Sequence, residues 1–392
     1  MKKKYLFLAI ILSFCTNFVQ SQIPIMAFYG VQKIEDKDYK RFKEAGFSIS
    51  FFTFKNNEEG MNALDLAHKN GVKILYYTDE LITATAKTVN LVKDHPGLYG
   101  YFITDEPGTS KFSQQRNIVK SVQSLDSKHP AYINLLPNYA TQKQLGANSY
   151  TDYLELYLKT VPTPFFSFDF YPIKGNTVDN RWYSNLEEVR NAGIKFNKPF
   201  WGFANSTIFG DHKQPTLAGL KMQQFSNLLY GAKGLQYFTY WTLGTDNWKK
   251  NGFDYSIVYS DGSPTPTYAL VKAVNQQIQR LAWVFINSNV TAVYHDGVTI
   301  PINTQKLTKI PERFKIFNPD KKNVLVSYLQ NGNTKFVAVQ NKNLNTSISF
   351  KYKADSSVQI VDNDSGKMKS IPKNSTKTII LPGDVLIFTY TQ

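Results

Sequence analysis

The sequence has 392 residues, of which 42% are hydrophobic and 19% charged, so a disordered chain is excluded and two domains are expected. Aromatic residues make up 15%, which is typical of proteins that present flat rings to a ligand. The formal net charge is +15, but the lysines are scattered and no nucleic-acid-binding motif occurs. We therefore do not expect nucleic acid as a partner.

The first 21 residues predict a secretory signal peptide. Three lysines at positions 2–4 precede an apolar run over residues 5–14, and Val-Gln-Ser at 19–21 fits a cleavage site. Cleavage there removes Cys15, the only cysteine, and lipidation at Cys15 is less favoured because a bulky phenylalanine precedes it. No later apolar run reaches the ~20 residues that a membrane span needs. We expect a secreted or periplasmic protein with no integral membrane segment after signal removal.

Residues 22–287 alternate short aromatic or β-branched runs with amphipathic helical stretches. This alternation predicts the α/β class and, with eight strands, a (β/α)8 TIM barrel. The predicted strands are 25–29, 47–54, 72–77, 98–104, 131–136, 165–171, 199–204 and 234–241. The predicted helices include 36–45, 60–70, 113–127, 150–160, 182–196, 216–230 and 267–283.

Residues 288–392 change to short alternating strands and turn signals, which predict a C-terminal all-β sandwich. Strands at 324–330 and 335–341, joined by an Asn-Gly-Asn turn, read as a β-hairpin. Further strands are expected at 346–352, 357–361, 377–381 and 385–390. From residue 289 onward, 14 Lys or Arg stand against 7 Asp or Glu. We interpret this excess as a solvated basic surface in preference to a site for an acidic polymer.

Polar and aromatic residues follow most of the predicted barrel strands. Because the chemistry of such barrels is found at the carboxyl ends of the strands, these residues are the candidate site. They are Asp79, Asp105, Glu106, Asn134, Asn138, Asp169, Tyr171, Asn205, Tyr240 and Trp241.

The segment 94–107 ends in Gly-Tyr-Phe-Ile-Thr-Asp-Glu-Pro. It resembles the strand-four motif of clan A glycoside hydrolases, and this variant of the motif is similar to that of barrels related to family 42 β-galactosidases. Asp-x-Tyr-Pro at 169–172 and the stretch 231–237 before Trp241 are also similar. The resemblance covers residues 22–287. It implies a TIM-barrel enzyme that hydrolyses glycosidic bonds in an oligo- or polysaccharide.

The resemblance implies that Glu106 is the general acid. A glycosidic oxygen leaves poorly unless it is protonated, and a carboxylic acid in an apolar pocket can keep its proton near neutral pH. Asp105 is the nearest like charge and would raise the pKa of Glu106 further. The alternative is that either acid only caps the following predicted helix.

The retaining enzymes of this clan carry a second Glu, the nucleophile, at the end of strand seven, where this chain has Asn205. Three replacements stay open. Asp105 with its neighbour resembles the Asp-Glu pair of hexosaminidase barrels, in which the substrate's acetamido group is the nucleophile. Asp169 or Asp79 could instead direct water in an inverting reaction, which needs carboxyls roughly 6.5–9.5 Å apart and which we favour slightly. Finally, the chain could bind carbohydrate without cleaving it.

Aromatic and amide side chains near the strand ends are candidate substrate contacts, because rings pack on the apolar faces of sugars and amides hydrogen-bond to hydroxyls. The candidates are Tyr171, Trp201, Tyr240, Trp241, Asn134, Asn138 and Asn205, with Asp79 as a further polar contact. Core packing of the rings and loop capping by the amides are the alternative interpretations.

No metal or cofactor is expected. The five histidines show no metal-binding or Ser-His-Asp spacing, and no glycine-rich phosphate loop occurs. The histidines are His68, His95, His129, His212 and His295. The oligomeric state is not predicted by any feature of the sequence.

Overall fold

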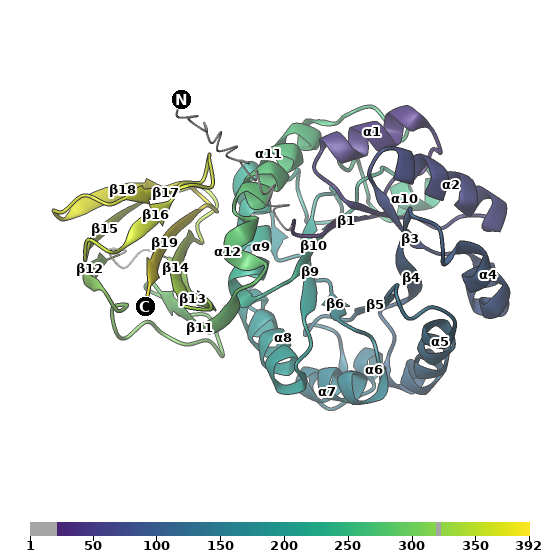
Figure 1. Ribbon diagram of the computed structural model, residues 1–392, viewed down its shortest axis with the longest axis horizontal. Helices are drawn as coiled ribbons and strands as arrows, with labels where there is room; N and C mark the ends of the chain where they lie inside the picture. Colours follow the sequence, from purple (N-terminus) through teal and green to yellow (C-terminus); the bar gives the residue numbers. More distant parts are fainter. Residues whose placement is uncertain (1–21, 319–322) are drawn as a thin grey trace, which may run out of the picture.

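The computed structural model describes residues 22–318 and 323–392, so the predicted signal peptide lies outside the described residues. Eight parallel strands close into a barrel in the order β1-β10-β9-β6-β5-β4-β3-β2, which confirms the predicted TIM barrel (Figure 1). These strands are β1 (Ile25–Phe28), β2 (Ile49–Phe51), β3 (Lys73–Tyr76), β4 (Leu98–Asp105), β5 (Ala131–Leu135), β6 (Phe166–Phe168), β9 (Phe200–Asn205) and β10 (Gly234–Phe238). Each lies in or overlaps one predicted run.

Helices surround the barrel on its outer side, as Figure 1 shows. The long ones are α1 (Asp36–Glu44), α2 (Asn57–Lys69), α4 (Thr85–Val92), α5 (Phe112–Leu125), α7 (Tyr150–Thr160), α8 (Trp182–Phe196), α9 (Leu217–Tyr230) and α11 (Pro266–Arg280). Short segments are α3 (Asp79–Thr83), η1 (Thr109–Lys111), α6 (Gln142–Leu145), α10 (Asp246–Lys250) and α12 (Ala282–Phe285), and a small hairpin consists of β7 (Ile173–Lys174) and β8 (Thr177–Val178).

Helix α4 is the main element that the sequence analysis missed. Its eight residues, TAKTVNLV, are rich in β-branched side chains, which have low helix propensity. The helix nevertheless buries Thr88, Val89 and Val92 on one face. Tertiary packing therefore outweighs local propensity in this segment.

Large side chains fill the inside of the barrel. Because strand residues alternate between the two faces, every second residue of a barrel strand points inward. The inward cluster consists of Met26, Phe28, Ile49, Phe51, Leu75, Phe102, Tyr132, Phe165, Trp201 and Phe203. Much of the aromatic content of the chain is therefore part of the core.

The C-terminal region forms two antiparallel sheets, which confirms the predicted all-β sandwich. The larger sheet has the order β11-β13-β14-β19-β16-β17, and the smaller has the order β12-β15-β18. The strands are β11 (Asn289–Asp296), β12 (Phe314–Asn318), β13 (Val324–Asn331), β14 (Thr334–Asn341), β15 (Ile348–Ala354), β16 (Gln359–Val361), β17 (Met368–Ser370), β18 (Thr376–Ile380) and β19 (Val385–Thr391). The predicted hairpin is β13 and β14, paired from Val324↔Asn341 to Asn331↔Thr334.

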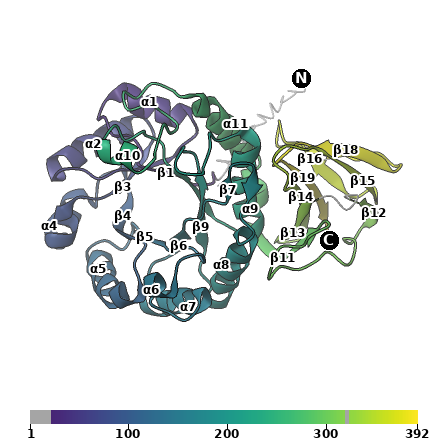
Figure 2. The ribbon, with the colours of Figure 1, turned by 180° about the vertical axis from the view of Figure 1, so that it is seen from behind.

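The larger sheet packs against the barrel on the side of α9, α11 and α12 (Figures 1 and 2). Side chains from this sheet, including Leu325, Phe336 and Ile387, join the same apolar cluster as the outer face of the barrel strands. Polar contacts also cross the contact surface: Ser226 Oγ donates to Gln340 Oε1 at 2.9 Å. The sandwich thus covers apolar barrel surface.

Among the described residues, no helix is both long enough and apolar enough to cross a bilayer.

Candidate active site

A β-bulge near the end of β4 sets the register of the candidate site. Pairing between β4 and β5 steps from Phe102↔Tyr132 to Thr104↔Ile133, so Ile103 is an extra residue on β4. The bulge brings Asp105 opposite Asn134. Bulges of this kind re-aim side chains and are common beside active sites.

Glu106 follows β4 directly and has a strained backbone. Its φ is +44°, in the left-handed region that residues with a Cβ seldom adopt. The backbone N–H of Glu106 donates to the carbonyl oxygen of Asn134 at 2.9 Å, and Tyr153 Oη donates to the carbonyl of Pro107 at 2.8 Å. These two hydrogen bonds hold the turn, and strain that is held in this way is concentrated at functional sites.

Asp105, Glu106 and Asp169 form one cluster of carboxyls at the carboxyl ends of β4 and β6. Asp169 comes directly after β6 and lies within hydrogen-bonding reach of Glu106. Asp105 and Glu106 are exposed, whereas Asp169 is partly buried and its Oδ1 has no hydrogen-bond partner among the described residues. The structure therefore brings together the three residues that the sequence predicts to be catalytic.

Surrounding protein makes ionisation of this cluster costly. Asp105 reaches solvent, but the protein atoms packed around its carboxyl remove part of its hydration and, with the charge of Asp169, raise its pKa to about 6. Burial and the charge of Asp105 raise the pKa of Glu106, and burial and the charge of Glu106 raise the pKa of Asp169 well above its usual value. Two neighbouring carboxyls that cannot both ionise share one proton, and they titrate as a pair. Burial and the neighbouring charges therefore favour a protonated carboxyl within the Glu106–Asp169 pair.

Aromatic side chains flank the carboxyls. The ring of Tyr171 lies 5.2 Å from that of Phe238, and Tyr29 lies 6.3 Å from Phe238 and 6.4 Å from Trp248 between ring centroids. Burial and the charge of Asp169 raise the pKa of Tyr171 well above its usual value, so this phenol lies close to the carboxyl of Asp169. Among these aromatic residues, which we call the aromatic wall, only Tyr171 was predicted as a site residue.

Three aromatic residues near the carboxyls were not predicted. Tyr29 and Phe238 stand at strand ends, so the strand-end rule could have found them. Tyr139 lies in the loop after β5 and is 42% exposed, and burial with the charges of Asp169 and Glu106 raises its pKa. Trp248 on α10 is 7% exposed and stacks on Phe253 at 4.0 Å between centroids, so it packs behind these rings.

The other predicted rings lie in the core, which corrects their assignment as sugar-stacking platforms. Tyr240 is 1% exposed and packs edge-on against Phe42, at 4.8 Å between centroids. Trp241 is 2% exposed, and its Nε1 donates to the carbonyl of Ser260 at 3.3 Å. Neither ring has surface left to offer a ligand.

Trp201 also fills space in the core. It stacks on Phe165 inside the barrel, with 4.6 Å between centroids. A Cβ at Gly234 would meet the Trp201 ring at 2.2 Å, so the neighbouring strand needs glycine for this ring to fit. This placement corrects Trp201 from a predicted substrate contact to a core residue.

The predicted amides are engaged with their own surroundings. Asn205 at the end of β9 is buried, and its side chain bonds both the N–H and the carbonyl of Thr207, at 3.1 and 3.0 Å. The Nδ2 of Asn138 points to α8, 3.3 Å from Ser184 Oγ. Asn134 is buried behind Asp105, to which its Nδ2 donates at 3.0 Å. These bonds engage Asn134 and Asn205, whereas Asn138 Oδ1 is buried and has no hydrogen-bond partner among the described residues.

Asp79 lies at the end of β3, beside β4, as the first residue of α3. Its carboxylate is exposed and accepts a hydrogen bond from Tyr77 Oη at 3.2 Å. It is therefore an exposed acid on the same end of the barrel as the carboxyl cluster.

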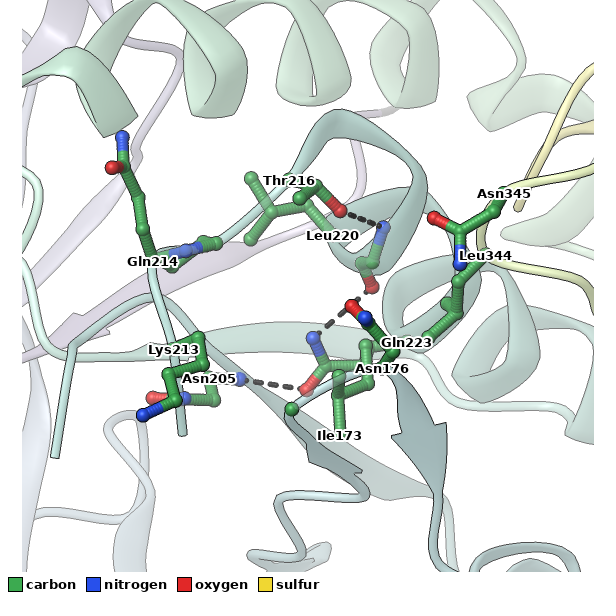
Figure 3. A pocket seen from close by; sticks show the side chains of 13 residues that line it. Ile173, Asn176, Asn205, Lys213, Gln214, Thr216, Leu220, Gln223, Leu344 and Asn345 are labelled. Carbon is green, nitrogen blue, oxygen red and sulfur yellow. Dashed lines mark hydrogen bonds between the residues drawn. The ribbon is translucent and has the colours of Figure 1, made fainter. Parts of the chain in front are cut away.

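A separate pocket lies between the β7–β8 hairpin, the start of α9 and the loop between β14 and β15 (Figure 3). Its buried glutamine bonds the local backbone: Gln223 Oε1 accepts from the backbone N–H of Asn205 at 2.9 Å, and Gln223 Nε2 donates to the carbonyl of Gly219 at 3.1 Å. Neither the carboxyl cluster nor its aromatic neighbours line this pocket. We therefore do not assign it to the active site.

Within residues 22–318 and 323–392, no group of three or more His, Cys, Asp or Glu side chains is arranged to hold a metal ion.

The sequence matches no family model and no curated protein. Among solved structures, a family 39 glycoside hydrolase from the gut symbiont Bacteroides cellulosilyticus WH2 is similar, with 12% identity and a TM-score of 0.58 over 95% of this chain and 81% of that one. An alpha-amylase from Anoxybacillus has 9% identity and a TM-score of 0.52 over 95% of this chain and 98% of that one. This chain therefore has the fold of glycoside hydrolases with an eight-stranded parallel barrel.

Proposed function

We propose that this chain is an exported glycoside hydrolase in which Glu106 protonates the leaving oxygen of an oligo- or polysaccharide. The observation that carries the proposal is the Glu106–Asp169 pair, two adjacent carboxyls with raised pKa values at the carboxyl end of the barrel. A carboxyl that keeps its proton near neutral pH is what general-acid cleavage of a glycosidic bond requires.

The aromatic wall supports carbohydrate as the substrate. Tyr171, Phe238 and Tyr29 lie ring to ring. Besides burial, the charge of Asp169 raises the pKa of Tyr171 and that of Asp105 raises the pKa of Tyr29, so both phenols lie near the carboxyls. Rings of this kind pack against the C–H faces of a sugar, and the tyrosine hydroxyls can bond its oxygens. The relation to family 42 barrels, implied by the Asp-Glu-Pro motif, belongs to this proposal.

The second step of the reaction does not use a strand-seven nucleophile in this proposal. Asn205 has no carboxylate and its amide is bonded to Thr207. Asp169 is a poor base for an inverting reaction, because it lies within hydrogen-bonding reach of Glu106 and a water needs carboxyls roughly 6.5–9.5 Å apart. Two routes follow: Asp79 directs water with inversion, or Asp105 orients a substrate acetamido group with retention.

The test is hydrolysis of a glycan panel, with the first-formed product anomer read by proton NMR. An inverted anomer on a sugar without an acetamido group assigns the second step to Asp79. A retained anomer that requires the acetamido group assigns it to Asp105. Retention on a sugar without that group would contradict both routes. Absence of any hydrolysis across the panel would contradict the proposed function itself.

A non-catalytic carbohydrate-binding protein is the second candidate, and the amide at Asn205 in place of an acid is the observation that favours it. Calorimetric titration with the same glycans separates the two functions. Binding without release of reducing ends supports the second candidate, whereas turnover supports the first.

Export depends on the amino-terminal segment, residues 1–21. We expect expression in a secreting host to yield protein that begins at Gln22, as measured by intact mass. A product that retains residues 1–21 would contradict the proposed export.

A further inference from the structure

A chain of buried hydrogen bonds runs through the inside of the barrel and ends at Asp105. Its members come from three strands: Tyr132 on β5, Ser167 on β6 and Gln236 on β10, with Asn134 on β5 as the last link. All four side chains are at most 2% exposed. A polar chain in an aromatic core is costly unless every member is satisfied, so the direction of each bond is informative.

The direction of the bonds starts at the phenol. Tyr132 has one hydroxyl hydrogen, and burial raises the pKa of this phenol well above its usual value, so it stays a donor. Its Oη lies 2.6 Å from Gln236 Oε1 and 3.0 Å from Ser167 Oγ, and it donates to the nearer Gln236 oxygen, while Gln236 Nε2 donates to Ser167 Oγ at 2.7 Å. In this arrangement the Gln236 amide turns its oxygen to Tyr132 and its NH2 group to Ser167.

The remaining links transmit that orientation to the carboxyl cluster. Ser167 Oγ accepts from Gln236 and donates its own hydrogen to Asn134 Oδ1 at 2.9 Å. The Asn134 oxygen is thereby occupied, and its Nδ2 faces Asp105 Oδ1 at 3.0 Å. The reversed Asn134 amide would present an oxygen to Asp105, which a carboxylate cannot tolerate but a protonated carboxyl can.

We propose that Tyr132, Gln236 and Ser167 are positioning residues that act through Asn134 to keep Asp105 ionised. The proton of the three-carboxyl cluster then stays on the Glu106–Asp169 pair. The inference rests on the proposed function for its meaning in catalysis. The ionisation of Asp105, however, is measurable without substrate.

The test is a carboxyl titration by NMR on the full chain labelled with 13C at aspartate Cγ, with Asp105 assigned from the signal that Asp105→Asn removes. Breaking the chain with Tyr132→Phe or Ser167→Ala lets the Asn134 amide reverse. Loss of a hydrogen bond to a charged group is expected to raise the Asp105 midpoint by about 1 pH unit. Tyr157→Phe is the matched control, because it removes a buried hydroxyl that bonds Thr163 at 3.0 Å and takes no part in the chain.

An unchanged Asp105 midpoint in both Tyr132→Phe and Ser167→Ala would overturn the proposal, as would an equal rise of that midpoint in Tyr157→Phe. If neither Tyr132→Phe nor Ser167→Ala folds, 15N spectra of the wild-type protein test the proposal. The Asn134 side-chain NH2 signals should shift with the same midpoint as the Asp105 titration. NH2 signals that do not shift with it would contradict the proposal. A midpoint that responds as expected in a protein without hydrolase activity would refute the proposed function and leave this inference standing.

Discussion

The carboxyl ends of β4 and β9 lie on the same rim of one barrel but are built in opposite ways. At β4, Asp105 and Glu106 are exposed acids on a strained turn, next to a third carboxyl that has an unpartnered oxygen. At β9, Asn205 is a buried amide that is bonded to its own loop. Polar groups that are fixed in place but lack hydrogen-bond partners are available for chemistry, whereas polar groups with all their hydrogen bonds made stabilise the fold.

In our proposal the chemistry therefore lies at the ends of β4 and β6, and β9 is part of the scaffold. The aromatic residues divide in the same way. Tyr240 and Trp241 are buried, whereas Tyr171 and Phe238 are partly exposed.

Deletion of the sandwich after residue 287 is expected to have the largest effect. The larger sheet covers apolar surface of the barrel, and exposure of that surface promotes aggregation. We expect the truncated chain to be recovered in the insoluble fraction. A soluble barrel with full activity would show that the sandwich is an independent accessory.

Asp169→Asn tests the shared proton. The asparagine cannot carry the proton and its amide can donate to Glu106, so the pKa of Glu106 falls. Because a general acid loses activity as pH rises through its pKa, the alkaline limb of the pH–rate profile should move to lower pH. A shift of about one unit costs roughly tenfold in rate on that limb. An unchanged limb would mean that Asp169 and Glu106 do not titrate together.

Asp105→Asn is expected to stabilise the protein at neutral pH. Asp105 has a folded-state pKa of about 6 against an ordinary 3.8, so the folded state binds its proton more tightly than the unfolded state. Its contribution is therefore favourable at low pH and is lost as pH rises from 3.8 to about 6. Since the side chain is exposed, we expect a modest gain in Tm of about 1–3 °C above pH 6 and none near pH 4.

The control for this prediction is Asp364→Asn, a change of the same type at an exposed turn position of the sandwich. Its Tm should not depend on pH in this way. A Tm difference for Asp105→Asn that is constant from pH 4 to pH 7 would contradict the raised pKa of Asp105.

Asn205→Ala is expected to have the smallest catalytic effect. Loss of the bonds to Thr207 should lower stability by about 1 kcal/mol and change kcat by less than about threefold. A 2-deoxy-2-fluoro glycoside should leave no covalent adduct on residue 205 of the wild-type protein, as judged by peptide mass spectrometry. A large loss of kcat in Asn205→Ala, or a covalent adduct on residue 205, would show that the end of β9 takes part in catalysis.

The fold could be predicted because buried parallel strands appear as short apolar runs between amphipathic helices. The carboxyl cluster could be predicted because strand ends converge in a barrel. The rings were less predictable, since β10 ends at Phe238, three residues before the end of the predicted strand. That error moved the assignment from Phe238 to Tyr240 and Trp241.

The role of Asn134 could not be predicted from its position alone. The bulge at Ile103, which sets Asp105 opposite Asn134, depends on the pairing of β4 with β5. The chain of bonds that directs the amide involves residues up to 104 positions apart in sequence, as between Tyr132 and Gln236. Long-range contacts of this kind leave no local pattern in the sequence.

The central claim is that Glu106 donates the proton to the leaving oxygen. The most direct measurement compares Glu106→Gln with wild type on two glycosides of one sugar. One has a poor, alkyl leaving group, and the other has dinitrophenol, which leaves without protonation. Glu58→Gln, an exposed glutamate on α2, is the matched control.

We predict that Glu106→Gln lowers kcat/KM about 10²–10⁴-fold on the poor leaving group and far less on dinitrophenol, while Glu58→Gln behaves as wild type on both. Equal losses on the two substrates, or full activity of Glu106→Gln on the poor leaving group, would contradict the claim.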